Sequence, residues 1–264
     1  MLALVSRPAR FRLVALLLAL LGALSGPLRA QVTETPHTMA PGSFLLRVDA
    51  ITIGVDRDRT APKTYTALGL ASALLSTGVT RDLDVQFGMQ FFLRQTYQLQ
   101  GSNRTSSGRG DSTIRAKYTF WRDPAHGAAM AVIPYLKLPS NTGGVGNNHT
   151  EGGVIVPWAM NLGRGTDLGA MGQWDLRRNP ANTRYDSRWL VSGYAKQHLI
   201  GGLAAYAEST FSVSSASAST FVGGLGGGVT FDVSKSLQFD YNLSRGLGNR
   251  ATDWTNLLRV NWRF

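Results

Sequence analysis

The sequence between Leu83 and Arg94 alternates between apolar and polar side chains, with Phe92 as the one exception. In an extended chain the apolar members share one face and the polar members share the other. This period of two is typical of a β-strand whose faces meet different surroundings. The same alternation recurs in residues 113–120 and 237–244, and no segment after residue 42 keeps a helical period. We therefore predict an all-β fold.

The lengths of the apolar stretches reduce the number of all-β folds that the chain could adopt. After residue 30, none approaches the roughly 20 residues that a membrane-spanning helix needs. A chain that crosses a membrane must satisfy its backbone hydrogen bonds internally, so without helices it must form a closed barrel. Residues 43–264 are predicted to form a transmembrane antiparallel up-and-down β-barrel of about 12 strands. These strands are expected at 43–55, 64–77, 82–96, 111–122, 128–138, 152–162, 166–177, 184–196, 200–212, 218–232, 235–245 and 254–264.

The connections between these strands alternate in length. Bacterial barrels have short periplasmic turns and longer extracellular loops, so this order predicts that both termini are periplasmic. The strands at 64–77, 128–138 and 200–212, rich in Ala and Leu, alternate poorly. Short links are expected at 80–81, 123–126, 163–165, 197–199 and 234–235, and longer polar links at 57–63, 98–110, 140–151, 178–184, 214–219 and 246–252.

Residues 1–30 have the order of a secretory signal peptide. Three arginines precede an apolar run, Leu13–Leu24, and small residues then lead to Ala30. The run is too short for a spanning helix and a Gly-Pro pair ends it, which favours cleavage after Ala30 over an N-terminal anchor. Because the chain has no Cys that could be acylated, we do not expect a lipoprotein. Residues 31–42 would then form a short periplasmic leader before the barrel.

The final strand ends on an aromatic residue. Leu258, Val260, Trp262 and Phe264 alternate with polar residues up to the last position. This ending resembles that of bacterial outer-membrane barrels, and the resemblance implies that Trp262 and Phe264 act as an assembly signal. The implied partners are the barrel-assembly machinery and periplasmic chaperones during biogenesis, and the lipid of the cell outer membrane.

The charge of the chain excludes one class of partner. Four of the 27 basic residues and none of the 16 acidic residues lie in the first thirty positions, so the remaining chain keeps a net charge near +7. Its basic residues are scattered singly and form no cluster, and therefore we expect no nucleic-acid partner. The excess instead suggests a lumen or rim that favours anions.

Short motifs in the barrel region resemble those of one family. Gly108–Asp111 leads into a strand that carries Lys117, and Tyr135–Ser140 contains a Lys-Leu-Pro-Ser sequence, although Asn141 follows where a Gly is usual. The chain resembles, over roughly residues 64–264, the family named for a MetA-pathway of phenol degradation. Its members are commonly labelled outer-membrane transporters, so the resemblance implies barrel topology and transport. Segments similar to its closing hairpin and final loop are Gly228–Phe231, Leu237–Asp240 and Arg245–Leu247.

The polar faces of the strands form the candidate functional surface. Inward charges of both signs could line a narrow channel that selects by size and field, or they could form a salt-bridged plug that holds the barrel closed. A barrel of about twelve strands has a bore between a filled eight-stranded and an open sixteen-stranded one, so both alternatives stay open. The lumen-lining candidates are Asp84, Arg94, Arg115, Lys117, Lys137, Asp175, Arg188, Glu208, Asp240, Arg259 and Arg263.

The histidines and acids show no catalytic arrangement. His37, His126, His149 and His198 lie in the leader, turns or a loop, and none lies on a strand with a Ser and an acid nearby, as nucleophilic catalysis requires. The pattern of His and acids also has no metal-ligand spacing. We therefore expect no enzyme, no metal and no cofactor.

Two further motifs have simpler explanations. Asp82 and Asp84 share a strand face as an acid/base pair could, but we expect them to pair with Arg115 or Lys117. The glycine run 223–228 lacks the helix that follows a phosphate-binding loop. It is better explained by bending and by the close approach of an inner element.

These observations predict a porin-like passive pore or transporter for small molecules, with hydrophobic or aromatic ones favoured. The alternative from another class is a non-transporting barrel that stiffens the envelope or binds a surface partner through its long loops. An outer-membrane lipid hydrolase ranks third, and it would require acyl release that His149→Ala abolishes.

Overall fold

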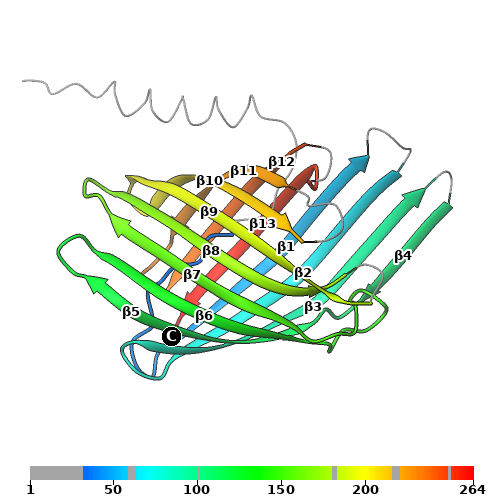
Figure 1. Ribbon diagram of the computed structural model, residues 1–264. Helices are drawn as coiled ribbons and strands as arrows, with labels where there is room; N and C mark the ends of the chain where they lie inside the picture. The colour runs from blue at the N-terminus through cyan, green and yellow to red at the C-terminus, as the bar shows by residue number, and fades with distance from the viewer. Residues whose placement is uncertain (1–31, 59–62, 100–101, 180–182, 216–220, 249–250) are drawn as a thin grey trace, which may run out of the picture.

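The alternating segments form strands that pair around a closed ring (Figure 1). The computed structural model describes residues 32–58, 63–99, 102–179, 183–215, 221–248 and 251–264, so the predicted signal peptide lies outside the described residues. Among the described residues, no helix has the length and apolar character of a membrane span. The strands are β1 Phe44–Asp58, β2 Lys63–Gly78, β3 Leu83–Leu99, β4 Ser102–Gly108, β5 Ser112–Asp123, β6 Ala128–Leu138, β7 Glu151–Asn161, β8 Thr166–Arg178, β9 Tyr185–Ile200, β10 Leu203–Ser214, β11 Val222–Asp232, β12 Leu237–Leu247 and β13 Trp254–Arg263.

Twelve of these strands close the barrel. β1 pairs antiparallel with both β2 and β13, and β3 pairs with both β2 and β5. The remaining strands pair with their neighbours in sequence order. The predicted twelve-stranded antiparallel barrel is therefore confirmed. Closure gives every strand two partners, as a lipid environment requires.

The two ends of the barrel differ in their connections. Links of at most four residues join β2 to β3, β5 to β6, β7 to β8, β9 to β10 and β11 to β12. We call this the turn end and the opposite one the loop end. The N–H of Phe44 donates to the carbonyl of Phe264 at 2.8 Å, so the first and last strands meet at the turn end. At the loop end β1 and β2 stay paired to Asp58 and Lys63, which leaves a shorter link there than expected.

A thirteenth strand, β4, lies outside the ring. β3 pairs with β5 from Leu83 to Met89 but with β4 from Leu93 to Leu99, so its second half projects beyond the ring with β4 beside it (Figure 1). The sequence predicted only a long polar link across this region. Residues 102–108 are polar on both faces, so they lack the alternation that marks a strand with one apolar face.

A local irregularity explains why β2 alternates poorly. β1 shifts its register against β13 between Asp49 and Ile51. In β2, next to this point, Ala71 has a φ of 53°. A left-handed residue interrupts the pleat of a strand, and the small alanine side chain limits the steric cost. The period of two therefore breaks within β2.

The two faces of the wall differ in polarity. Outward apolar side chains stay exposed, as Phe87 at 47%, Val191 at 56% and Trp189 at 57% show. Inward charged side chains are buried instead, with Asp84 at 1% and Lys117 at 4%. Soluble proteins bury apolar side chains and expose charged ones. An apolar outer wall around a polar interior fits a barrel in hydrocarbon.

Aromatic side chains gather where the chain ends meet. The ring of Phe264 stacks on Phe44 with centroids 5.5 Å apart, and it lies 4.9 Å from the ring of Trp262. All three side chains are exposed on the outer wall or rim. Such rings suit the interface between lipid and water.

Candidate functional site

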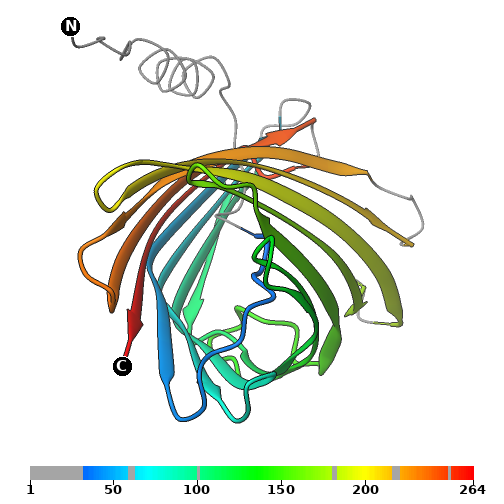
Figure 2. The same cartoon turned by 90° about the vertical axis from the view of Figure 1, so that its left-hand side faces the viewer.

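Residues 32–41, which we call the leader segment, run inside the ring. Figure 2 looks into the barrel and shows this segment, in dark blue, between the walls. Side chains of β1, β3, β5, β8, β9 and β10 bind it. From the alternation pattern, these residues were predicted only to link the signal peptide to the first strand. Their position depends on partners as far as 176 residues away.

The first residues of the leader segment are held by Glu208 of β10. The N–H of Val32 donates to both carboxylate oxygens at 3.0 and 2.9 Å, and the N–H of Thr33 donates to Oε1 at 2.8 Å. Thr33 Oγ1 also lies 2.6 Å from Oγ of Ser192 in β9. Hydrogen bonds to an ionised carboxylate are stronger than neutral ones. This group therefore anchors the tip of the segment.

An apolar patch lies beneath Val32 on the lumen side. It consists of Ile133, Ile155, Met171 and Leu190, which are 0 to 6% exposed, and Val32 packs against it. We call it the lumen patch. It explains the poor alternation of β6, because that strand directs apolar residues to both faces. The lumen thus combines charged walls with one hydrophobic surface.

Glu34 lies between two arginines of the wall. Its carboxylate is 2.9 Å from Arg115 Nη2 and 3.4 Å from Arg47 Nη1. Burial raises the pKa of Glu34, but the charges of Arg115 and Arg47 outweigh that effect and hold the pKa well below its ordinary value. The leader segment therefore supplies an ionised carboxylate that neutralises inward positive charge.

The second half of the leader segment is held through its backbone. Lys117 Nζ donates to the carbonyl of His37 at 3.1 Å, and Thr119 Oγ1 donates to that of Pro36 at 2.5 Å. The N–H of Met39 donates to Asp84 Oδ1 at 2.9 Å. These contacts use backbone atoms of the leader segment, which every residue has. This explains why β5 and β3 can bind a segment with no distinctive sequence motif.

Asp82 and Asp84 have separate partners. Asp82 pairs with Arg122 at the turn end, where Arg122 Nη2 also donates to Thr38 Oγ1 at 2.8 Å. Asp84 lies opposite Lys117 in the strand register. Asp82 thus pairs with Arg122 instead of the expected Arg115 or Lys117, and Asp84 binds the backbone of the leader segment.

Two buried aspartates organise the walls on either side of the leader segment. Asp175 accepts hydrogen bonds from Tyr135 and from Gln173 Nε2, the latter at 2.6 Å. Asp240 accepts from Tyr206 Oη at 3.0 Å. On the adjacent strand Arg259 lies 3.9 Å from Asp240 and binds Asp49 at 2.6 Å.

The glycine run of β11 makes room for Tyr206. Gly228 lies opposite Tyr206 in the register, and a Cβ at Gly228 would lie 2.6 Å from the tyrosine hydroxyl. The glycine thus allows the ring to lie flat against the neighbouring strand. This is the close approach of an inner group that the sequence analysis expected of the glycine run.

The predicted lumen residues lie in the lumen, at the loop end or at exposed positions outside the lumen. Most are inward and largely buried: Asp84, Arg115, Lys117, Asp175, Arg188, Glu208, Asp240 and Arg259. Lys137 binds Asp111 at 2.9 Å and Glu151 at 3.1 Å. Arg94 lies on the projecting half of β3, opposite Ser107 of β4, and Arg263 is exposed at the turn end.

Several site residues escaped the sequence analysis. Glu34, Arg47, Tyr135 and Tyr206 all bind within the lumen. The two tyrosines were not predicted as lumen residues because most of their side-chain surface is apolar. Glu34 was not predicted because it precedes the first strand. One feature of the sequence could have indicated Glu34: the predicted barrel has a net positive charge, which an acid near it would partly neutralise.

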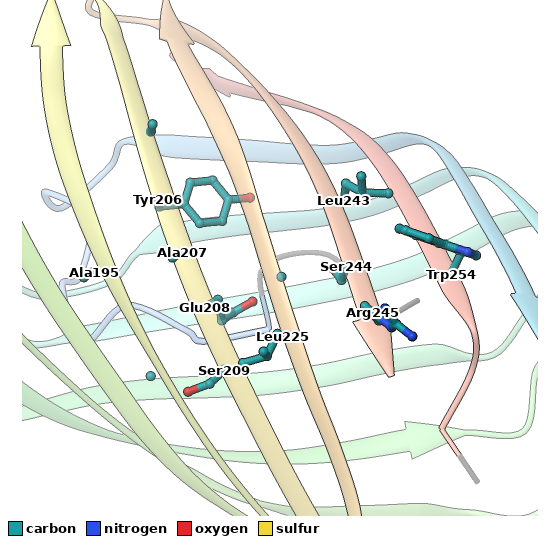
Figure 3. A pocket seen from close by; sticks show the side chains of 13 residues that line it. Ala195, Tyr206, Ala207, Glu208, Ser209, Leu225, Leu243, Ser244, Arg245 and Trp254 are labelled. Atoms are coloured by element: carbon teal, nitrogen blue, oxygen red, sulfur yellow. The ribbon is translucent and has the colours of Figure 1, made fainter. Parts of the chain in front are cut away.

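The wall itself has a hollow of about 370 Å³ that is lined by residues of the five neighbouring strands from β9 to β13 (Figure 3). Tyr206 and Glu208 of the inward face line it together with outward Leu243 and Trp254. Residues from both faces of the wall line this hollow, because the alanines of β10 and Gly226 have small side chains or none, and the wall is thin at this point. Its lining is mainly apolar.

Two histidines at the turn end each contact one aspartate. Across the described part of the chain, no group of three or more metal-ligating side chains could hold a metal ion. His126 and His198 each pair with an aspartate of a turn, Asp123 at 2.7 Å and Asp167 at 3.1 Å. These pairs lie at exposed positions at the turn end.

Comparisons with known proteins place this fold among outer-membrane barrels. Residues 41–264 match the family described as "Putative MetA-pathway of phenol degradation". No curated protein matches the sequence. The COG4313 outer membrane channel from Pseudomonas putida F1 superposes with a TM-score of 0.68 at 11% identity, covering 90% of this chain and 100% of that one.

Two autotransporter domains are also similar in fold. The translocator domain of NalP from Neisseria meningitidis has a TM-score of 0.57 at 12% identity, covering 96% of this chain and 95% of that one. The β domain of BrkA from Bordetella has a TM-score of 0.54 at 13% identity, covering 86% and 100%. At these identities the likeness concerns the fold.

Proposed function

Because the chain belongs to the family described as "Putative MetA-pathway of phenol degradation", we propose that it is a passive outer-membrane channel for small hydrophobic or aromatic molecules. The barrel named an outer membrane channel in Pseudomonas putida F1 supports the channel. In this proposal the turn end and both termini are periplasmic, and a cleaved signal peptide precedes the leader segment.

The observation that carries this proposal is the lumen patch. A pore for hydrophilic solutes has a polar lining, whereas Ile133, Ile155, Met171 and Leu190 form an apolar surface within a charged lumen. Small hydrophobic solutes gain free energy on such a surface, at about 25 cal/mol per Å² of apolar area removed from water. Val32 covers the patch, so a solute that displaces the tip of the leader segment would uncover it.

The leader segment is the element that controls the lumen. Its contacts are mostly hydrogen bonds and ion pairs to side chains of the wall, which contribute about 1.5 to 3 kcal/mol each where a charged group takes part. They are separate from the backbone hydrogen bonds between the strands, so the segment can leave and return while the strands of the ring stay paired. The ring binds the segment, and the segment sets how much of the bore is open.

The non-transporting alternative has support from two features. The leader segment fills the lumen, and β3 and β4 project beyond the ring as a polar arm that could bind a surface partner. Flux measurements separate the two functions, because a non-transporting barrel leaves uptake unchanged.

Uptake of a labelled monoaromatic hydrocarbon by intact cells tests the proposal. Cells that produce the protein should take up the label faster than cells with an empty vector. Leu190→Asn, which makes the lumen patch polar, should remove most of this gain. Leu257→Asn is the matched control, since Leu257 is buried at 1% outside the patch. Equal uptake with protein and with empty vector would refute transport and leave the non-transporting barrel.

A further inference from the structure

A second hollow lies in the lumen next to the tip of the leader segment. It has a volume of about 230 Å³, and Val32, Leu190 and Val222 contribute apolar side chains to its lining. Arg177 of β8 and Arg188 of β9 line it as well. The hollow thus has an apolar side and a cationic side.

The two arginines share one carboxylate. Asp175 Oδ2 lies 3.2 Å from Arg177 Nη2 and 3.5 Å from Arg188 Nη1. The other oxygen of Asp175 accepts from Tyr135 and Gln173. Two guanidinium groups therefore share the carboxylate of Asp175, so these three side chains together have one more positive than negative charge.

The geometry directs this charge into the hollow. Asp175 is 0% exposed and does not line the hollow, while the side chains of Arg177 and Arg188 are 38% and 18% exposed and do line it. A second carboxylate, that of Asp186, lies opposite Arg177 in the register between β8 and β9, and it is paired with Arg184 at 3.1 Å. An entering molecule therefore meets guanidinium groups in front and their carboxylate behind.

We propose that this hollow binds a small monocarboxylate with a flat apolar body, such as an aromatic acid. The planar guanidinium group presents paired donors that match the two oxygens of a carboxylate. The apolar body would lie against Leu190, Val222 and Val32. A dry apolar cavity of about 150 Å³ accommodates benzene, so the volume here suits one ring with its carboxylate.

This inference rests on the proposed function in that it names a class of solute for the same lumen. It extends that function, since a hydrocarbon would use the lumen patch alone and an acid would also need the arginines. Val32 belongs to both surfaces, so the bound acid and the docked leader segment would stabilise each other.

Calorimetric titration of the detergent-solubilised protein tests the site. The probes are benzoate and its neutral isostere benzamide, used at constant ionic strength. Benzoate should bind at least tenfold more tightly than benzamide. Equal affinity for the two probes, or no binding of benzoate, would overturn the inference.

Variants then assign the binding to the two arginines. Arg188→Gln and Arg177→Gln should each weaken benzoate binding about tenfold or more, with benzamide little changed. Arg94→Gln is the matched control, because it removes the same charge from an exposed side chain on the projecting half of β3 that does not line the hollow. An equal loss in the control would show a general charge effect and overturn the assignment.

Two further measurements keep the test independent of folding and of transport. Arg188→Lys retains the charge but not the paired donors, so intermediate affinity is expected, and full affinity would refute paired recognition. A heat-induced shift in gel mobility checks that each variant is folded. Benzoate binding without hydrocarbon uptake would refute the proposed function alone, whereas uptake without benzoate binding would refute this inference alone.

Discussion

At the scale of single residues, Glu34 forms ion pairs with two arginines of the lumen wall. It joins Arg47 of β1 to Arg115 of β5 and so connects the leader segment to two walls. Without its charge, two buried guanidinium groups face each other without a carboxylate. Removal of one partner from a buried ion pair costs more than the intact pair contributes.

Glu34→Gln should therefore weaken docking of the leader segment by about 3 kcal/mol, which corresponds to about a hundredfold rise in the undocked population. Single-channel recording should show longer open periods. Glu151→Gln is the control, because Glu151 pairs with Lys137 towards the loop end. Identical behaviour of the two variants would contradict the role assigned to Glu34.

We expect docking of the leader segment to depend on pH through His37. Partial desolvation, together with the charges of Lys117 and Arg122, holds the pKa of His37 below its ordinary value of 6.5. The docked segment thus favours neutral His37, and its stability is fully present above about pH 6.5 and falls as the pH drops through the lowered pKa.

Conductance should accordingly rise when the pH is lowered from about 7.5 to 5. The cause is protonation of His37 next to two cations, so His37→Gln should lose most of this dependence. An unchanged pH response in His37→Gln would assign the effect to another group.

At the scale of elements, the leader segment contacts the ring closely enough for a disulfide to link the two. Thr33 Oγ1 and Ser192 Oγ lie 2.6 Å apart. The chain has no Cys of its own, so an introduced pair has no competing thiol. A disulfide of about 2.05 Å fits between side chains that already touch.

The double variant Thr33→Cys, Ser192→Cys should form this disulfide on oxidation and keep the channel in its low-conductance state. Reduction should restore the open periods of the unmodified protein. The single variant Thr33→Cys controls for the substitution itself. If oxidation leaves conductance and hydrocarbon uptake unchanged, movement of the leader segment is not required for passage.

At the scale of the whole molecule, stability depends on an apolar wall in contact with lipid. Val191 lies in the middle of β9 with 56% exposure, and Tyr185 lies at the start of the same strand with 45% exposure. A charge on the lipid-facing side costs most at the centre of the bilayer and little near the interface.

Val191→Lys should therefore lower the free energy of unfolding in lipid vesicles by about 2 to 4 kcal/mol, and Tyr185→Lys by at most about 1 kcal/mol. Urea titration of vesicle-inserted protein measures both. Equal effects would place the outer wall in an environment without a depth gradient, such as water.

The sequence by itself determined the strands of the ring and the polarity of their faces. Alternation is a local property, because a period of two in residues 83–94 specifies which side chains share a face before any partner strand is known. Asp84 and Lys117 are for this reason found inside and Phe87 outside. Alternation failed in β2, where Ala71 interrupts the pleat, and in β6, where the inward face joins the lumen patch.

Only the tertiary structure decided what fills the ring and which inward charges meet. The leader segment has no period of its own, and its place depends on partners such as Glu208, 176 residues away. β4 forms only because β3 extends beyond the ring and offers it a free edge. Arg177 and Arg188 share Asp175 through the register between β8 and β9. Such pairings arise when distant strands close into a barrel, and no local pattern encodes them.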